Sequence, residues 1–173
     1  MPKLLESAPR TQCLEDAGAA ARSGPDAALQ LHWGSPAALA LAAATVRRLQ
    51  RCARLVAPDE CCGALLGERD RHGVARVHAA LPLPNVAATP RTHYTVAPRA
   101  LQRVHAAARG RALDILGFYH SHPAGGWTPS DLDQSLAWPW YIYLIVGHRL
   151  AAWCTAARDA PLRELPIRDA DFA

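Results

Sequence analysis

The two histidines of the segment His120-Ser121-His122-Pro123 have the spacing of ligands to one metal ion. They follow residues 113–119, a short apolar run rich in branched and aromatic side chains, which is typical of a strand buried on both faces. Side chains two positions apart on an extended chain point to the same side. The sequence therefore predicts that His120 and His122 direct two imidazoles at one point just beyond the end of this strand.

A carboxylate follows at a spacing that suits a third ligand. The seven residues after His122 include two prolines and two glycines, so they form a turning loop that ends the strand and brings the chain back. Ser130 then lies where a helix begins, and the side chain of Asp133, three positions on, can face back towards the two imidazoles. Three nitrogen or oxygen ligands with an open fourth position are the pattern of a catalytic zinc site.

Each half of this pattern also has a simpler interpretation. Ser-x-x-Asp is a capping-box-like signal that marks many helix starts, and paired histidines at a strand end are often only solvated. Asp131 competes with Asp133 as the third ligand, although an acidic residue directly after an N-cap is well placed to complement the helix dipole. The combination of both halves across a seven-residue loop is far more restrictive than either alone, and it favours the metal site.

The combined segment resembles the signature of the JAMM (MPN+) metalloprotease family, in which His-Ser-His-Pro is followed after a fixed gap by Ser-x-x-Asp. A second segment, Pro-Asp-Glu-Cys-Cys-Gly at residues 58–63, is similar to the Pro-x-Glu-x-Cys-Gly segment of that family. The resemblance covers roughly the last two-thirds of the chain and weakens after about Val146. It implies one Zn²⁺ per chain held by His120, His122 and Asp133, with Glu60 as general base and Ser130 as a stabiliser of the oxyanion.

The activity that this resemblance implies is hydrolysis of an amide bond by a metal-activated water molecule. Residues 85–87, 91–94 and 138–146 resemble segments of a small bacterial branch of the family. Members of that branch include peptidases that release cysteine, or another small adduct, after the C-terminal Gly-Gly of a ubiquitin-like sulfur carrier protein. Such a peptidase, with the carrier as its protein partner, is the first hypothesis. The candidate substrate contacts are Asn85, Arg91, Tyr94 and Trp127.

Two other functions stay open from the sequence. A deconjugating isopeptidase would remove a ubiquitin-like modifier from other proteins, although the chain lacks long insertions that would receive a second modifier. A non-catalytic MPN scaffold is the other alternative, since many MPN domains serve only as interaction platforms. Such scaffolds typically lose ligand residues, whereas all of the family's ligand positions are filled here.

Length and composition limit the domain organisation and the partners. At 173 residues and 50% hydrophobic, the chain can form one domain with a core and an extension. Residues 1–34 show no sustained periodicity and are predicted to be a partly disordered extension, and residues 35–173 form the JAMM/MPN domain. The net charge is +4 without a run of basic residues, so we expect no nucleic-acid partner. The oligomeric state is left open, with a homodimer as the candidate.

The cysteines and the chain start indicate a cytoplasmic protein. Five scattered cysteines without a C-x-x-C pair favour neither a disulfide framework nor a cysteine-based zinc site, which suits a reducing compartment. The first residues lack the apolar stretch of a signal peptide. The longest apolar run, residues 36–46, is too short to span a membrane, so no membrane partner is expected.

The remaining patterns predict an α/β fold, with a mixed β-sheet flanked by helices and the metal at one end of its strands. The resemblance implies the MPN/JAMM fold, which is cytidine-deaminase-like, as a single domain. Helices are predicted from the Ser35 N-cap to about Leu55, over 98–109, and briefly after Ser130. Strands are predicted over 62–67, 74–81, 113–119, 141–146 and 150–155, with an edge strand over 162–167.

Overall fold

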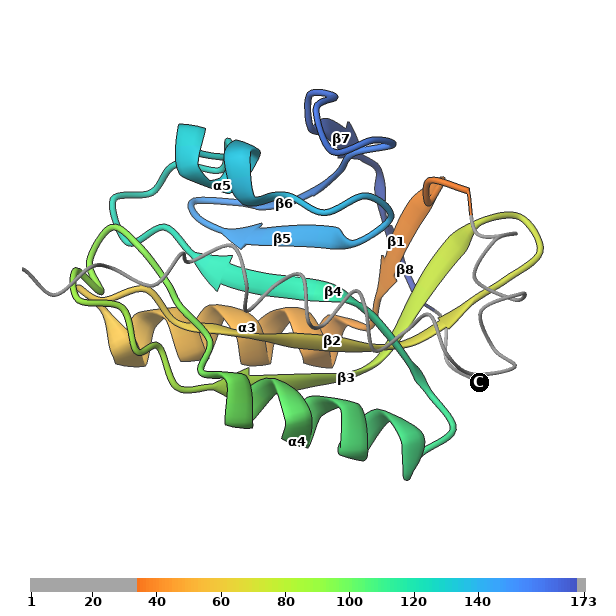
Figure 1. Ribbon diagram of the computed structural model, residues 1–173, viewed down its shortest axis with the longest axis horizontal. Helices are drawn as coiled ribbons and strands as arrows, with labels where there is room; N and C mark the ends of the chain where they lie inside the picture. The colour runs from red at the N-terminus through yellow and green to blue at the C-terminus, as the bar shows by residue number, and fades with distance from the viewer. Residues whose placement is uncertain (1–33, 171–173) are drawn as a thin grey trace, which may run out of the picture. The chain divides into compact units, whose positions relative to one another are not determined.

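The computed structural model describes residues 34–170, which form one eight-stranded mixed sheet with helices on both faces (Figure 1). The predicted extension, residues 1–34, lies outside the described residues except for Gly34. The elements are β1 (Ala38–Leu41), α3 (Ala43–Val56), β2 (Cys62–Arg69), β3 (Val74–Leu83), α4 (Pro98–Arg109), β4 (Asp114–Ser121), α5 (Asp131–Leu136), β5 (Ile142–Val146), β6 (Leu150–Cys154), β7 (Arg163–Leu165) and β8 (Ile167–Asp169).

The strand order is β7-β6-β5-β4-β2-β3-β1-β8. Three neighbouring pairs, β4 with β5 and β1 with both β3 and β8, are parallel, and the other pairs are antiparallel. The predicted mixed sheet is therefore confirmed. Among residues 34–170, no helix has both the length and the apolar character needed to cross a membrane.

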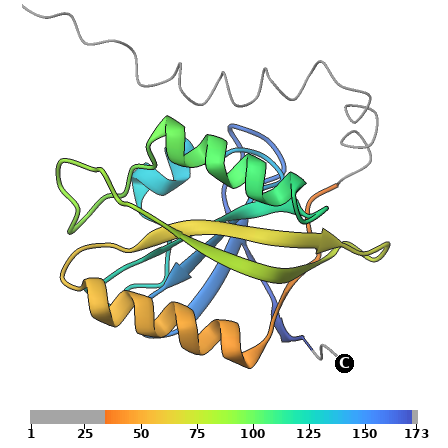
Figure 2. The ribbon, with the colours of Figure 1, turned by 90° about the horizontal axis from the view of Figure 1, so that it is seen from below.

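Helices α3 and α4 cover opposite faces of the sheet (Figure 2). Leu49 of α3 is buried in a core cluster with residues of several strands, among them Leu65 and Leu144. Val104 of α4 packs on the other face, in a cluster that includes Leu66. Because both faces are covered, the central strands are apolar almost throughout, and all five residues of β5 are buried.

The predicted start of the first helix is wrong. Ser35 and Pro36 do not begin it, because Ala38–Leu41 form strand β1 and the helix starts at Ala43. All four residues of β1 are buried and pair with β3 on one side and β8 on the other. Alanine and leucine favour helices locally, but the free energy of burial between two strands overrides that propensity.

The predicted edge strand at the C-terminal end is two strands. β7 pairs with β6 at one edge of the sheet, whereas β8 pairs with β1 at the opposite edge. Pro166, which separates them, has no N–H to donate to a ladder, but its carbonyl accepts a hydrogen bond from Leu39 N–H at 3.0 Å. The chain therefore passes from one edge of the sheet to the other within a single residue.

The pairing of β2 with β4 positions the candidate site. These strands are antiparallel, with Cys62 opposite His120, so the start of β2 and the end of β4 meet at one end of the sheet. Glu60 lies just before β2, and His122 lies just after β4. The two motifs, 60 residues apart in the sequence, are brought together by this register.

Candidate metal centre

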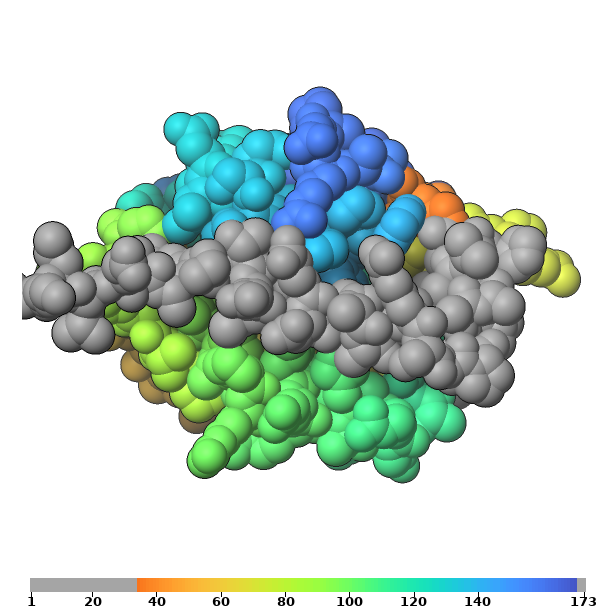
Figure 3. Space-filling view, viewed as in Figure 1, coloured from red at the N-terminus to blue at the C-terminus, as the bar shows by residue number. Residues whose placement is uncertain are grey.

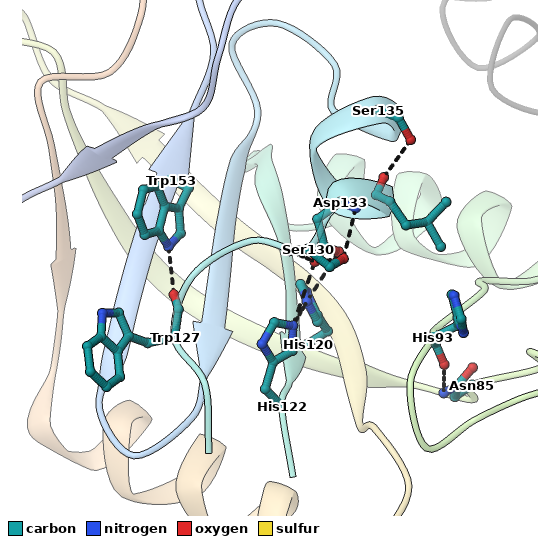
Figure 4. Close-up of polar contacts among 10 residues, drawn as sticks. Asn85, His93, His120, His122, Trp127, Ser130, Asp133, Ser135 and Trp153 are labelled. Atoms are coloured by element: carbon teal, nitrogen blue, oxygen red, sulfur yellow. Dashed lines mark hydrogen bonds and ion pairs between the residues drawn. The ribbon is translucent and has the colours of Figure 1, made fainter. Parts of the chain in front are cut away.

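Three predicted ligands converge at this end of the sheet (Figure 4). The Nε2 atoms of His120 and His122 are 3.0 Å apart. Asp133 Oδ1 lies 3.4 Å from Nε2 of His120, and its Oδ2 lies 3.6 Å from Nε2 of His122. The predicted convergence of two imidazoles and a carboxylate is therefore present in the structure.

The spacing of these donor atoms fits one zinc ion. Ligands about 2.0–2.1 Å from a tetrahedral zinc lie roughly 3.3–3.4 Å from one another, and the donor atoms here are 3.0–3.6 Å apart. His120 is 1% exposed, and its Nδ1 has no hydrogen-bond partner among the described residues. Its Nε2 is thus the nitrogen directed at the centre. Two imidazoles and one carboxylate are also a donor set that zinc accepts.

Asp133 is held by a capping box at the start of α5. The Ser130 backbone N–H and hydroxyl donate to Asp133 Oδ2 at 2.8 and 2.6 Å, and the Asp133 N–H donates to Ser130 Oγ at 3.2 Å. The helix-start interpretation of Ser-x-x-Asp is therefore confirmed, and the same carboxylate also faces the two imidazoles, as the ligand interpretation requires. Asp131 lies in the first turn of α5, and the metal-ligand cluster found within the described residues does not include it.

The loop between the histidines and α5 is fixed by Gly125. Its N–H donates to the His122 carbonyl at 2.8 Å, and its carbonyl accepts from the His148 N–H at 3.0 Å. Its φ is +94°, a conformation that favours glycine, and a Cβ there would strike the His148 imidazole. This packing against the β5–β6 turn brings the chain back from His122 towards Ser130.

Glu60 is buried beside the three ligands, with 5% of its surface exposed. Burial raises the pKa of its carboxyl to about 7, while His122 lowers it and Asp133 raises it. Burial also opposes ionisation of Asp133, but hydrogen bonds from His120, His122 and Ser130 outweigh it and hold the Asp133 pKa well below its usual range. The hydrogen bond with Asp133 raises the pKa of His122. One carboxyl is thus tuned to remain ionised and the other to exchange a proton near neutrality.

Ser121 and Pro90 hold the backbone at Glu60 and Cys61 in place, and sequence patterns did not indicate these roles. Ser121 Oγ accepts from the Cys61 N–H at 2.9 Å, and the Ser121 N–H donates to the Cys61 carbonyl at 2.9 Å. Pro90 accepts from the Glu60 N–H at 2.7 Å. The serine between the two histidines was the available signal for the first contact, whereas nothing local in the sequence indicates the second.

Asn85 and Tyr94, predicted as substrate contacts, support the site from within the protein. The Asn85 amide donates to the carbonyls of Glu60 and His93 at 3.0 and 2.9 Å. Its carbonyl oxygen accepts from the N–H groups of Ala87 and Thr95. The Tyr94 ring stacks on His120, with centroids 4.6 Å apart and planes at 21°. Loop 84–97 therefore connects Glu60 to His120, a candidate metal ligand.

Arg91 and Trp127, the other two predicted substrate contacts, are exposed at the surface. Arg91 lies on the same loop as Asn85 and Tyr94. Trp127 lies on the loop before Ser130, where Arg149 is stacked 5.0 Å from the centroid of its ring. The indole Nε1 of Trp153 donates to the Trp127 carbonyl at 3.0 Å (Figure 4). Both side chains are accessible to another molecule.

Comparison with known proteins supplies the family. Residues 42–158, more than half of the chain, match the family described as prokaryotic homologs of the JAB domain. The chain belongs to this JAB-domain family. The resemblance to the JAMM (MPN+) family in the sequence is thereby confirmed.

Two curated relatives of this JAB-domain protein match about half of its length. It is 42% identical over 89 residues, 51% of its length, to the desampylase of Haloferax volcanii. It is 38% identical over 92 residues, 53% of its length, to a probable TtuB-protein conjugate cleaving protease of Thermus thermophilus. These matches span 62% and 57% of the lengths of the two relatives.

Two solved structures are similar to this chain in fold. Protein DSY2949 from Desulfitobacterium hafniense has a TM-score of 0.68 and 28% identity, covering 76% of this chain and 92% of its own. A protein from Salinibacter ruber has a TM-score of 0.58 and 25% identity, covering 78% of this chain and 92% of its own. The mixed sheet with flanking helices is thus an arrangement that these relatives also have.

Proposed function

We propose that this JAB-domain protein is a zinc-dependent peptidase or isopeptidase that hydrolyses the amide bond after the C-terminal Gly-Gly of a ubiquitin-like protein. The observation that carries the proposal is the convergence of His120, His122 and Asp133 beside the buried Glu60. The similarity to a desampylase and to a probable TtuB-protein conjugate cleaving protease supports the proposal. We place the activity in the cytoplasm.

His120, His122 and Asp133 would hold the metal. Zinc bound in such a site polarises a carbonyl oxygen and lowers the pKa of a water molecule from about 15.7 towards ~7. In the proposed reaction Glu60 accepts the proton of the attacking water and later delivers it to the leaving amine. A pKa of about 7 suits both steps, because the carboxylate and the carboxylic acid are then both populated near neutral pH.

Ser130 has two proposed roles that differ in their consequences. Its hydroxyl donates to Asp133, which orients that ligand. As an oxyanion donor, the hydroxyl would have to turn towards the developing negative charge. Its hydrogen bond would then stabilise the transition state by roughly 3 kcal/mol. We propose both, with the ligand-orienting hydrogen bond formed before substrate binds.

The substrate we propose first is a ubiquitin-like sulfur carrier bearing cysteine, or another small adduct, after its terminal Gly-Gly. A tail without side chains can lie fully extended and pair with a strand edge. A deconjugating isopeptidase is the second candidate, and the word "conjugate" in the name of one relative favours it. A non-catalytic scaffold is the least favoured, since every ligand and the buried glutamate are in place.

The deciding experiment is intact mass spectrometry of two substrates incubated with zinc-loaded protein. One is a sulfur carrier ending in Gly-Gly-Cys, and the other is the same carrier linked through Gly-Gly to a lysine side chain. Wild type is expected to remove cysteine from the first, while Glu60→Gln binds zinc but leaves it intact. Cleavage of only the second would select the isopeptidase, and zinc binding without any cleavage would contradict the proposed hydrolase.

A further inference from the structure

Helix α3 presents a strongly basic face to the surface. Four arginines and a leucine lie on one side, within about a third of the helix circumference, and all are exposed: Arg47, Arg48, Arg51, Arg54 and Leu55. The helix has no aspartate or glutamate. Within residues 34–170, none of these arginines forms an ion pair. The face is thus free to meet an acidic surface.

The same helix ends at the metal centre. Only residues 57–59 separate its last residue, Val56, from Glu60. The turn is tight, since the Asp59 N–H donates to the Val56 carbonyl at 3.1 Å. Leu55, in the last turn, is 73% exposed. A molecule bound along α3 would therefore border the entrance to the site.

Exposed apolar side chains gather around this end of the molecule. Six of the eight large apolar side chains exposed in the described residues belong to α3, loop 84–97, the loop before Ser130, and α5. Figures 1 and 3 show α5 and loop 84–97 at the left-hand end, where β4 terminates. The six are Leu55, Val56, Val86, Trp127, Leu132 and Leu136. Such a concentration is typical of a surface that contacts another protein.

We propose that the exposed face of α3 docks the folded body of the ubiquitin-like protein, through an acidic surface of that partner with an apolar contact to Leu55. This rests on the proposed function, because the partner is the protein whose Gly-Gly tail enters the site. An extended tail of four to six residues spans roughly 13–20 Å. That length allows the tail to run from α3 past the turn at residues 57–59 to Glu60.

A protein fits this face better than a nucleic acid. α3 contains no aromatic side chain on which bases could stack. Arginine is enriched at protein interfaces, and the exposed Leu55 beside Arg54 adds apolar area that a protein partner can bury. Helix α4 provides the contrast, because its exposed Arg99, Arg103 and Arg109 are accompanied by no exposed large apolar residue.

The test is charge reversal on α3 with two substrates. In the triple variant Arg47→Glu, Arg51→Glu, Arg54→Glu, KM for a ubiquitin-like protein ending in Gly-Gly-Cys should rise about tenfold or more, with kcat unchanged. Cleavage of a synthetic peptide made of its last residues should stay at the wild-type rate. Raising the salt concentration should increase the wild-type KM, because it screens attraction, and should not increase the KM of the variant, whose glutamates repel the acidic surface.

The matched control reverses three arginines of α4, on the opposite face of the sheet. Arg99→Glu, Arg103→Glu, Arg109→Glu makes the same change in net charge, and each triple includes one arginine of the last helical turn. It should leave KM for the protein substrate unchanged. An equal rise in KM with both triples would overturn the proposal, because net charge and not the α3 face would then control binding.

A single variant and a binding measurement keep the proposal testable if the triple variant misfolds or turnover is absent. Leu55→Asp should weaken binding of the same protein substrate to the Glu60→Gln background in titration calorimetry, with an unchanged melting temperature. Unchanged affinity would overturn docking at α3. So would a difference in molecular mass between Leu55→Asp and its parent without substrate in light scattering, because Leu55 would then contact a second copy of the chain. If wild type cleaves neither the ubiquitin-like protein nor the tail peptide, the proposed function fails. The calorimetric affinity still tests docking at α3 separately.

Discussion

The two halves of the candidate metal centre are held in different ways. His120 comes from strand β4 and is almost completely buried, in register with β2, whose start adjoins Glu60. Asp133 comes from α5, a six-residue helix without a buried residue. We call His120, His122 and Glu60 the strand half and Asp133 with Ser130 the helix half. The core positions the strand half, and hydrogen bonds position the helix half.

Those hydrogen bonds tie α5 to the C-terminal segment and to β5. The Gln134 side chain donates to the Ala160 carbonyl at 3.2 Å and accepts from the Leu162 N–H at 2.9 Å. After the helix, the Trp138 N–H donates to the Tyr143 hydroxyl at 2.7 Å. Because polar contacts at a surface open more readily than a packed core, we expect the Asp133 side of the centre to be the more adjustable one.

The largest effect is expected from removing His122, the candidate ligand directly after β4. His122→Ala should abolish zinc binding and all hydrolysis, because two donors remain where three are needed. The side chain is only partly buried, so the metal-free variant should melt near the metal-free wild type. Zinc stoichiometry by mass spectrometry and calorimetric melting check both statements, and retained zinc would mean that another residue is the ligand.

Removing charge from the strand half should change the pH dependence of stability. The pKa of Glu60 is raised from 4.5 to about 7, so the unfolded state ionises first as pH rises. Metal-free wild type should therefore lose up to about 3 kcal/mol of stability between these two pH values. Glu60→Gln should lack this loss. Denaturant unfolding of both proteins at pH 4.5 and 8 measures it, and parallel curves would contradict the buried-carboxyl account.

The helix half is probed by Ser130→Ala. Loss of the hydrogen bond to Asp133 should lower zinc affinity about 10- to 100-fold, and loss of the cap should cost about 1 kcal/mol of stability. Competition with a chelator measures the affinity. If kcat at saturating zinc falls about 10²-fold or more, Ser130 also stabilises the oxyanion. A normal kcat would leave only its role in orienting the ligand.

The smallest effect on activity is expected at the connection between Glu60 and loop 84–97. Asn85→Asp keeps the shape but removes the donor to the Glu60 and His93 carbonyls, which should cost about 1–2 kcal/mol of stability. If Asn85 only supports the loop, kcat should fall while KM for a tail peptide stays constant. A rise in KM with unchanged kcat would instead favour the predicted direct contact with substrate.

The candidate site was predictable because its chemistry is encoded in short segments. Strand periodicity placed the two imidazoles, and the Ser130 N-cap placed Asp133, before any long-range contact was known. Glu60 was assigned from a family motif, since the β2–β4 register that brings it to the ligands cannot be read locally.

The failures of sequence prediction lie where long-range pairing decides the structure. Ala38–Leu41 is a strand only because β3 and β8 flank it. The contacts of Asn85 and Tyr94 with Glu60 and His120 depend on how a loop folds over the strand ends, whereas the sequence suggested these residues only as substrate contacts, through the family resemblance. Local patterns thus predict that the three candidate ligands converge, whereas the hydrogen bonds and ring contacts that support them depend on the tertiary fold.

Because only Pro166 separates β7 from β8, one short segment provides both edge strands of the sheet, which bears on aggregation. Unpaired strand edges are templates for joining to other chains, and short edge strands with charged side chains block this. Here one short segment, residues 163–169, blocks both edges of the sheet, with Arg163 and Glu164 at one edge and Arg168 and Asp169 at the other. Detachment of that segment would uncover β6 and β1 together. The protection of both sheet edges against pairing with another chain therefore depends on the attachment of these seven residues.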